Sequence, residues 1–277
     1  MGCGVSAPKP ASTVSEHHSF EEPSGVRIFV YEPADSSGRK DVFALLDADA
    51  AFFDSCVQAH LSSRAAVIGQ EGRHWFPELV LVGVQPPKAW SRNSPRYTAF
   101  IQSELPDILG RFGTKPYGGG RAIGALHASP GLAILRSLLA YEHHEVHKLY
   151  RFYLLGLGGD AGVSASMSTS ALPDKTAVFL SAAHAQEPAA RKLEAALLRR
   201  TDTGATDTSM FVTRDGEQTY TQHARKGPPP VTLDLVDAAD ASSRAAFASR
   251  AMLWLGERVE AQKLVSLGSL LPWHEFK

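Results

Sequence analysis

Residues 118–125 read GGGRAIGA, and their spacing matches a motif of covalent catalysis in all but one position. In the pattern G-x-S-x-G, a serine sits on a sharp strand-to-helix turn, and its neighbours are small because the turn leaves no room for larger side chains. Gly120, Arg121 and Gly124 fit this nucleophile elbow, but Ala122 stands where the serine belongs. A methyl group cannot attack a carbonyl carbon. The sequence therefore predicts a turn that is kept and a nucleophile that is lost.

The amino-terminal residues MGCGVS match M-G-x-x-x-[ST], the pattern for N-myristoylation of the glycine that follows Met1. One myristoyl chain gives only marginal membrane binding, so a stable anchor needs a second signal. A basic patch cannot be that signal, because residues 1–25 contain none. Cys3 can supply it by palmitoylation. We expect acyl chains on Gly2 and Cys3 to hold the protein on the cytoplasmic face of a membrane. The alternative is a chance match in a flexible terminus.

Composition limits the other classes of function. The chain has 277 residues, of which 44% are hydrophobic and 21% charged, and this allows a large buried core. The net charge is -1 and the basic residues are scattered, which argues against a nucleic acid partner. The cysteines, Cys3 and Cys56, do not suggest a disulfide framework, and no apolar run is long enough to predict a transmembrane helix.

Two further patterns point toward a metal or a nucleotide, and neither is complete. His143 and His147 are spaced to share one helical face, but no third ligand is evident in the sequence. Residues 156–161 match G-x-G-x-x-A, yet the serine-rich stretch after them does not open a convincing helix. We therefore expect no metal site and no cofactor.

Short apolar runs alternate with longer amphipathic runs from residue 26 onward, which indicates an α/β fold with a mainly parallel sheet and helices on both faces. We interpret residues 1–25 as an anchor signal with a flexible spacer, residues 26–262 as one domain and residues 263–277 as a tail. The expected strands cover residues 26–31, 42–46, 79–84, 152–155, 177–180, 209–212 and 231–235.

Four segments carry a family resemblance through their order and spacing. Residues 42–48 read VFALLDA and residues 76–84 read FPELVLVGV. Residues 100–106 read FIQSELP and residues 120–125 read GRAIGA. In this order they resemble L-L-D-G, P-x-x-I-V-V-G-I, F-I-x-x-E-L-x-P and G-H-S-L-G-G of the enterochelin-esterase-like and esterase D-like branch of the α/β-hydrolases. The resemblance extends over roughly residues 26–258 and implies the α/β-hydrolase fold.

In that family a serine attacks an ester carbonyl, a histidine accepts its proton and an acid orients the histidine. The resemblance carries the serine position to Ala122 and the histidine position, just before the last helix, to Ala241. It carries the acid to Glu187, which would equally suit the start of a helix. The oxyanion would be held by the backbone amides of Ile123 and Ala48.

The loss of both the nucleophile and the base implies an esterase-like pseudoenzyme that binds a small acyl or ester-like ligand or a protein. One alternative is an active carboxylesterase or thioesterase with a displaced nucleophile and His223 or His184 as the base. For the nucleophile, Ser129 lies seven residues from Ala122, too far for the elbow, and Cys56 lies in an apolar helical stretch. A second alternative is a lipid-anchored scaffold with no functional pocket.

Overall fold

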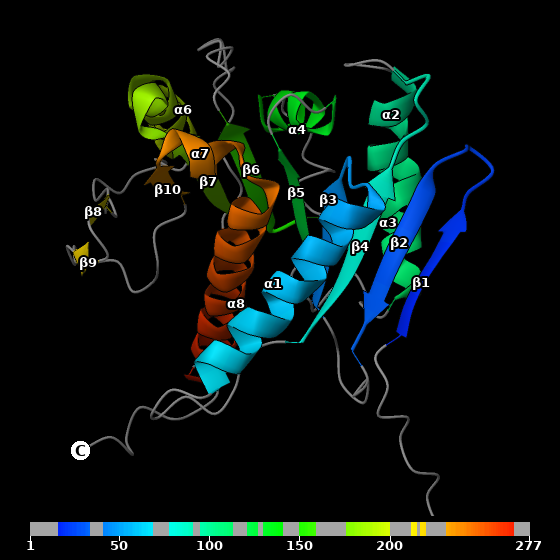
Figure 1. Cartoon of the computed structure of the whole chain (residues 1–277), viewed down its shortest axis with the longest axis horizontal. Coiled ribbons are helices and arrows are strands. Elements are labelled where there is room, and N and C mark those ends of the chain that lie inside the picture. Colours follow the sequence, from blue (N-terminus) through cyan, green and yellow to red (C-terminus); the bar gives the residue numbers. More distant parts are fainter. Residues whose placement is uncertain are drawn as a thin grey trace, which may run out of the picture.

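The computed structural model describes most of the chain between Glu16 and Gly268. The described residues are 16–33, 41–68, 78–90, 95–112, 121–126, 130–140, 150–158, 176–199, 212–214, 217–219 and 231–268. Within them, one large sheet is covered by helices on both faces (Figure 1).

The sheet has eight strands in the order β1-β2-β4-β3-β5-β6-β7-β10. Strands β4, β3, β5, β6, β7 and β10 run parallel, whereas β2 is antiparallel to both β1 and β4. The strands are β1 Glu16–Glu21, β2 Arg27–Glu32, β3 Asp41–Leu46, β4 Leu79–Gln85, β5 Arg121–Leu126, β6 Phe152–Gly158, β7 Ala177–Ala183 and β10 Val231–Val236. A separate pair, β8 Val212–Arg214 and β9 Glu217–Thr219, is antiparallel.

Helices α1 Ala50–Ile68 and α8 Arg244–Gly268 lie side by side on one face of the sheet (Figure 1). The other face packs against α2 Pro95–Ala99, the π-helical turn η1 Phe100–Glu104, α3 Leu105–Arg111, α4 Pro130–Ala140 and α6 Glu187–Arg199. The two faces have separate apolar cores, because alternate side chains of each strand point to opposite sides. Two short helices, η2 His184–Gln186 and α7 Ala238–Ser242, follow β7 and β10.

The predicted fold class is confirmed. Every residue of β3 and of β7 is buried, which explains their continuous apolar sequences, since a parallel strand covered on both faces has no polar side. The expected strands at residues 26–31, 42–46, 79–84, 152–155, 177–180 and 231–235 all correspond to observed strands. The expected strand at residues 209–212 lies outside the described residues except for Val212, which begins β8.

The predicted domain limits need correction at both ends. Residues 16–21 lie within the predicted spacer, but they form β1 and pair along their whole length with β2. This strand has a partner on one side only, so it contains polar residues, and its one large apolar residue, Phe20, packs against the core. At the other end, α8 continues to Gly268, beyond the predicted limit at residue 262. None of the described helices is long and apolar enough to cross a membrane.

His60 of α1 is a buried polar residue far from the carboxyl ends of the strands. Its Nε2 accepts a hydrogen bond from the backbone amide of Leu79, the first residue of β4, at 3.4 Å. Burial, with a smaller contribution from the nearby positive charge of Arg64, lowers the pKa of His60 from 6.5 to about 4. His60 is therefore neutral in the folded protein, where it joins α1 to the sheet.

We predict that His60 makes the protein less stable in acid. Because its pKa is lower in the folded state than in the unfolded state, its contribution is complete above pH 6.5 and declines as the pH falls toward 4. Between pH 7.5 and 5 the decline is about 2 kcal/mol. Urea unfolding of the wild type and of His60→Gln, measured at both pH values, should show the wild-type stability falling by about 2 kcal/mol more than that of the variant. Parallel decline in both proteins would contradict this assignment.

Candidate functional site

The carboxyl ends of the parallel strands meet at one edge of the sheet, where open α/β folds place their ligands. Four connections leave this edge at positions that matter for hydrolytic chemistry. They are Asp47–Asp49 between β3 and α1, residues 127–129 between β5 and α4, residues 184–186 after β7, and residues 237–243 between β10 and α8.

The predicted nucleophile elbow at residues 118–125 is wrong. Ala122 is the second residue of β5, is 1% exposed, and pairs with Phe43 on one side and Phe152 on the other. The strand continues to Leu126, and α4 begins at Pro130. The strand-to-helix connection is therefore residues 127–129, which lie outside the described residues.

The glycine that suggested the elbow has a different physical role. A Cβ on Gly124 would lie 2.9 Å from the Phe43 ring and 3.2 Å from the carbonyl oxygen of Leu154. Real Cβ atoms essentially do not approach their neighbours so closely, so this position in the strand accepts only a glycine without rearrangement. The spacing of Gly120 and Gly124 is thus explained by strand packing at Gly124 and not by a turn. Gly120 itself is outside the described residues, and Arg121 is the first residue of β5.

The corrected turn reopens one alternative. Residues 127–129 read His-Ala-Ser, so the serine of the connection between β5 and α4 is Ser129. Because Ala122 is not in the turn, the separation of seven residues between Ala122 and Ser129 does not exclude Ser129 as a nucleophile. Ser129 also precedes Pro130, the first residue of α4, and this is the preferred sequence of a helix N-cap. The sequence thus leaves both a nucleophile and a cap open at this position.

Neither predicted oxyanion donor is available for a ligand. Ile123 lies inside β5, paired with Ala44 and with Tyr153, so its amide belongs to the sheet ladder. The amide of Ala48 donates a hydrogen bond of 3.0 Å to the carbonyl oxygen of Val84 at the end of β4. The prediction that these two amides hold an oxyanion is wrong, because both are used to build the sheet and its edge.

Asp47, which the sequence did not single out, lies at the centre of this edge. Its backbone has a φ of 56°, in the left-handed region, at the point where the chain leaves β3. Its Oδ2 accepts a hydrogen bond of 2.6 Å from the backbone amide of Gly131 in the first turn of α4. Pro130 has no N–H group, so the Gly131 amide is the first that the helix can offer. The carboxylate therefore occupies the positive end of the α4 dipole.

Two neighbours fix the position of this carboxylate. A Cβ on Gly131 would lie only 2.5 Å from Oδ2, so the close approach of α4 to the end of β3 requires a glycine. The Tyr97 side chain of α2 is fully buried beside Asp47. Burial, together with the negative charge of Asp47, raises the pKa of Tyr97 well above 10, so this phenol stays protonated and remains a donor.

The predicted acid and base positions fall after the expected strands, but they hold no catalytic pair. Glu187 is the first residue of α6, and its Oε1 accepts a hydrogen bond of 2.7 Å from Arg191 one turn later. Ala241 is buried in α7, and its amide donates to the carbonyl oxygen of Asp237. The connection from Asp237 to Ser243 contains no histidine.

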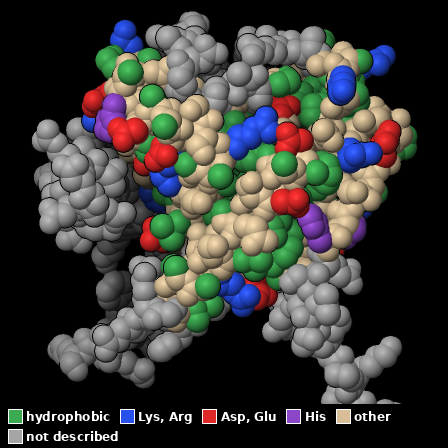
Figure 2. Space-filling view, in the orientation of Figure 1, with side chains coloured by type: hydrophobic (Ala, Val, Ile, Leu, Met, Phe, Trp, Pro, Cys, Tyr) green, Lys and Arg blue, Asp and Glu red, His purple; other side chains and the backbone are tan. Residues whose placement is uncertain are grey.

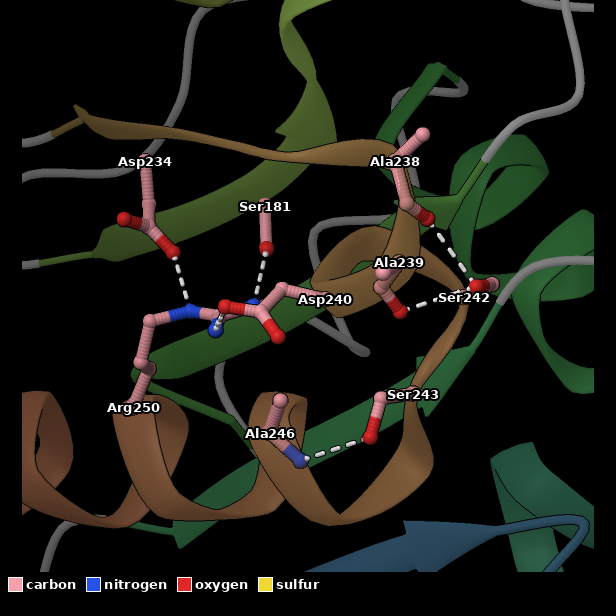
Figure 3. A network of polar contacts seen from close by, with 9 residues as sticks. All are labelled: Ser181, Asp234, Ala238, Ala239, Asp240, Ser242, Ser243, Ala246 and Arg250. Carbon is pink, nitrogen blue, oxygen red and sulfur yellow. Dashed lines mark hydrogen bonds and ion pairs between the residues drawn. The ribbon is translucent and has the colours of Figure 1, made fainter.

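The segment between β10 and α8 is held by a polar network that sequence reasoning missed (Figure 3). Arg250 of α8 donates from Nε to Asp234 at 2.7 Å and from Nη2 to Ser181 at 3.3 Å, and its Nη1 lies 3.8 Å from Asp240. Ser243 accepts from the amide of Ala246 and so caps the first turn of α8. These contacts join α7, α8, β7 and β10, and they give the segment a structural role.

Within the described part of the chain, the remaining candidates add no nucleophile. Cys56 is buried in the core beneath α1, and burial raises the pKa of its thiol far above neutrality, so no thiolate forms. His184 is exposed in η2, and His223 lies outside the described residues. Within the described ranges, no group of three or more His, Cys, Asp or Glu side chains could hold a metal ion, and the pair His143 and His147 falls outside them.

Comparison with solved structures finds esterases of similar fold. Esterase Est22 matches with a TM-score of 0.52 and 10% identity, over 91% of this chain and 82% of that chain. An esterase from Pyrobaculum calidifontis matches with a TM-score of 0.52 and 11% identity, over 91% and 86%. The feruloyl esterase module from Clostridium thermocellum, complexed with sinapinate, matches with a TM-score of 0.51 and 12% identity, over 92% and 91%. No family model and no curated protein matches the chain.

The strand order, the parallel sheet and these matches establish that the chain has an α/β-hydrolase fold. At identities near 10%, these matches show the fold and do not show an activity or a substrate.

We predict that Ala122→Ser does not create an esterase. The hydroxyl would enter a buried strand four residues before the end of that strand, where burial of an unpaired hydroxyl costs about 1–3 kcal/mol. Thermal unfolding should show a destabilised protein, and hydrolysis of p-nitrophenyl acetate should equal that of the wild type. New esterase activity in this variant would show that position 122 does reach the site.

Proposed function

We propose that this chain is an esterase-like α/β-hydrolase-fold protein that lacks serine-hydrolase chemistry, is held at a membrane by acyl chains, and acts by binding. The observation that carries the proposal is the Asp47 carboxylate on the amide of Gly131. In this fold, the oxyanion hole is built from the start of the helix after the nucleophile and from the loop after β3. Here the amide of Gly131 at the start of α4 donates to the Asp47 carboxylate. The amide of Ala48 in the loop after β3 donates to the carbonyl oxygen of Val84.

Electrostatics opposes ester hydrolysis at this edge. A tetrahedral oxyanion within reach of the Gly131 amide would lie beside a carboxylate of the same sign. Two unit charges about 4 Å apart repel each other by about 4 kcal/mol at the effective dielectric of a protein surface. Losing even one oxyanion donor reduces turnover by about 10²–10³-fold, so replacing a donor with a repelling charge is at least as severe.

Proton transfer is the second missing part. The connection after β10 would have to supply the base, and it carries Ala241 and Asp240 but no histidine. Asp240 is directed to Arg250, as Figure 3 shows, which leaves that carboxylate in the structural network.

The class of ligand that we propose, a small acyl or ester-like molecule, follows from the fold, and a protein partner is the other candidate.

The proposal predicts no covalent reaction with serine-directed reagents. We expect the purified full-length chain to show no labelling by a fluorophosphonate probe and no turnover of p-nitrophenyl esters above a heat-denatured control. Ser129→Ala should behave like the wild type in both assays, because the proposal gives Ser129 no part in a covalent reaction.

A specific observation keeps the active esterase as the second candidate, because the connection between β5 and α4 contains Ser129. Its signature would be labelling that Ser129→Ala abolishes. The matched control is Ser103→Ala, since Ser103 is exposed and donates to the carbonyl oxygen of Ala99 within the helical segment. Labelling that is lost in Ser129→Ala and kept in Ser103→Ala would overturn the pseudoenzyme proposal in favour of the esterase.

The anchor has its own test. In cells that contain N-myristoyltransferase, the wild-type chain should fractionate with membranes, and Gly2→Ala should move most of it to the soluble fraction, because the substitution removes the acyl acceptor. Gly4→Ala is the control, since it changes a neighbouring glycine that the pattern does not specify. Equal fractionation of the wild type and Gly2→Ala would reject acylation as the tether.

A further inference from the structure

One face of the molecule carries all of the exposed large hydrophobic side chains among the residues that the structure describes. They are Leu61 and Ile68 on α1, with 37% and 41% of their surface exposed, and Leu253 on α8, with 40%. Helices α1 and α8 pack against each other on the same side of the sheet. We call their outer surface the α1–α8 face.

The exposed surface of α1 within this face is poor in charge. The exposed residues of α1 are Ala50, Ala51, Asp54, Gln58, Leu61, Ser62, Ala65, Ala66 and Ile68. Asp54 is the one charged residue in that set, and it lies 3.5 Å from His17. Figure 2 looks onto this face, where charged side chains gather in small clusters separated by uncharged surface. A protein with 21% charged residues has thus left the exposed surface of α1 nearly uncharged, whereas α8 carries Arg244, Arg250, Glu257 and Arg258.

The ion pairs at the border neutralise the charge that remains. Arg244 at the start of α8 lies 2.7 Å from Asp49, and Arg64 of α1 is paired with Glu78. These two cations are thus each paired with a carboxylate, which favours apolar contact as the basis of binding at this face.

The amino-terminal segment leads to this same face. The described chain starts at Glu16 in β1, and the next residue, His17, packs its ring 5.3 Å from that of Phe53 on α1. Residues 1–15 precede it, and fourteen links can span up to about 48 Å when extended. Since α1 is about 28 Å long at 1.5 Å per residue, this length is enough for Gly2 to reach any point along α1.

We propose that the α1–α8 face lies against the lipid surface to which the acylated amino terminus is tethered. This inference rests on the acylation put forward under Proposed function. One acyl chain binds a membrane only marginally, and a tether that leaves from the edge of an apolar face keeps that face close to the lipid at high effective concentration. Because the cations at the border of the face, Arg64 and Arg244, are paired with Glu78 and Asp49, we expect binding not to require anionic lipid.

The experiment places an environment-sensitive dye on the face and, as a control, on the opposite side of the sheet. The N-myristoylated full-length chain carries Cys3→Ser with either Leu253→Cys or Lys192→Cys, each labelled with NBD. Lys192 is exposed on α6, which packs on the other face, and Cys56 is buried and unreactive. Vesicles are pure phosphatidylcholine, with or without brominated acyl chains, at concentrations that sediment the protein.

We expect the dye at position 253 to become brighter on binding and to be quenched by brominated lipid, while the dye at position 192 shows neither change. Equal responses at both positions, or no quenching at 253, with sedimentation that depends on Gly2, would overturn the inference and leave the anchor intact. A dye at 253 that responds to protein concentration without vesicles would also overturn it, because the face would then bind a second copy. Failure of Gly2 to affect sedimentation would instead reject the anchor.

A charge substitution provides an independent readout. Leu253→Glu places a carboxylate on the proposed contact and should lower the vesicle partition coefficient of the myristoylated chain about fivefold or more, which corresponds to about 1 kcal/mol. Lys192→Glu, with the same final residue on the opposite face, should leave partitioning in neutral vesicles unchanged. Equal partitioning of both variants would contradict the proposed orientation.

Discussion

The hydrogen bond from the amide of Gly131 to the carboxylate of Asp47 is the contact around which the site is arranged. It joins the end of β3 to the start of α4, and the space between them admits no side chain at position 131. It also determines the chemistry, since the positive end of a helix dipole already has an anion. In a serine hydrolase, the corresponding amides must be free until charge develops on the substrate. Here the acceptor is a carboxylate that belongs to the protein itself.

Most of the fold could be predicted from the sequence, because strands buried on both faces appear as uninterrupted apolar runs. β3, β4 and β7 can be recognised in this way. β1 could not be found, since an edge strand with one partner tolerates Glu16, His17 and His18. β5 was misread because strand packing against Phe43 and a tight turn both demand glycine, and the sequence does not tell the two apart.

The candidate site was less predictable than the fold. The positions after β7 and β10 were located, because the order of the strands determines them. The role of Asp47 depends on a positive φ and on a glycine 84 residues away, neither of which leaves a local signal. The one local indication was the pair Pro130-Gly131 at the start of a helix. Gly131 offers the first free amide of that helix, and its lack of a side chain lets a distant acceptor approach. Arg250 likewise became meaningful only when β7, β10 and α7 were seen around it.

The account depends on the Asp47 carboxylate occupying the amino end of α4 in solution, and the amide of Gly131 reports this directly. In ¹⁵N-resolved NMR spectra, we expect the Gly131 amide proton to be shifted downfield and protected from exchange with solvent. Asp47→Asn, which replaces a charged acceptor with a weaker neutral one, should move that resonance upfield and leave the Phe52 amide, which donates to Asp49, unchanged. A Gly131 amide that exchanges freely in the wild type, or that ignores Asp47→Asn, would contradict the account.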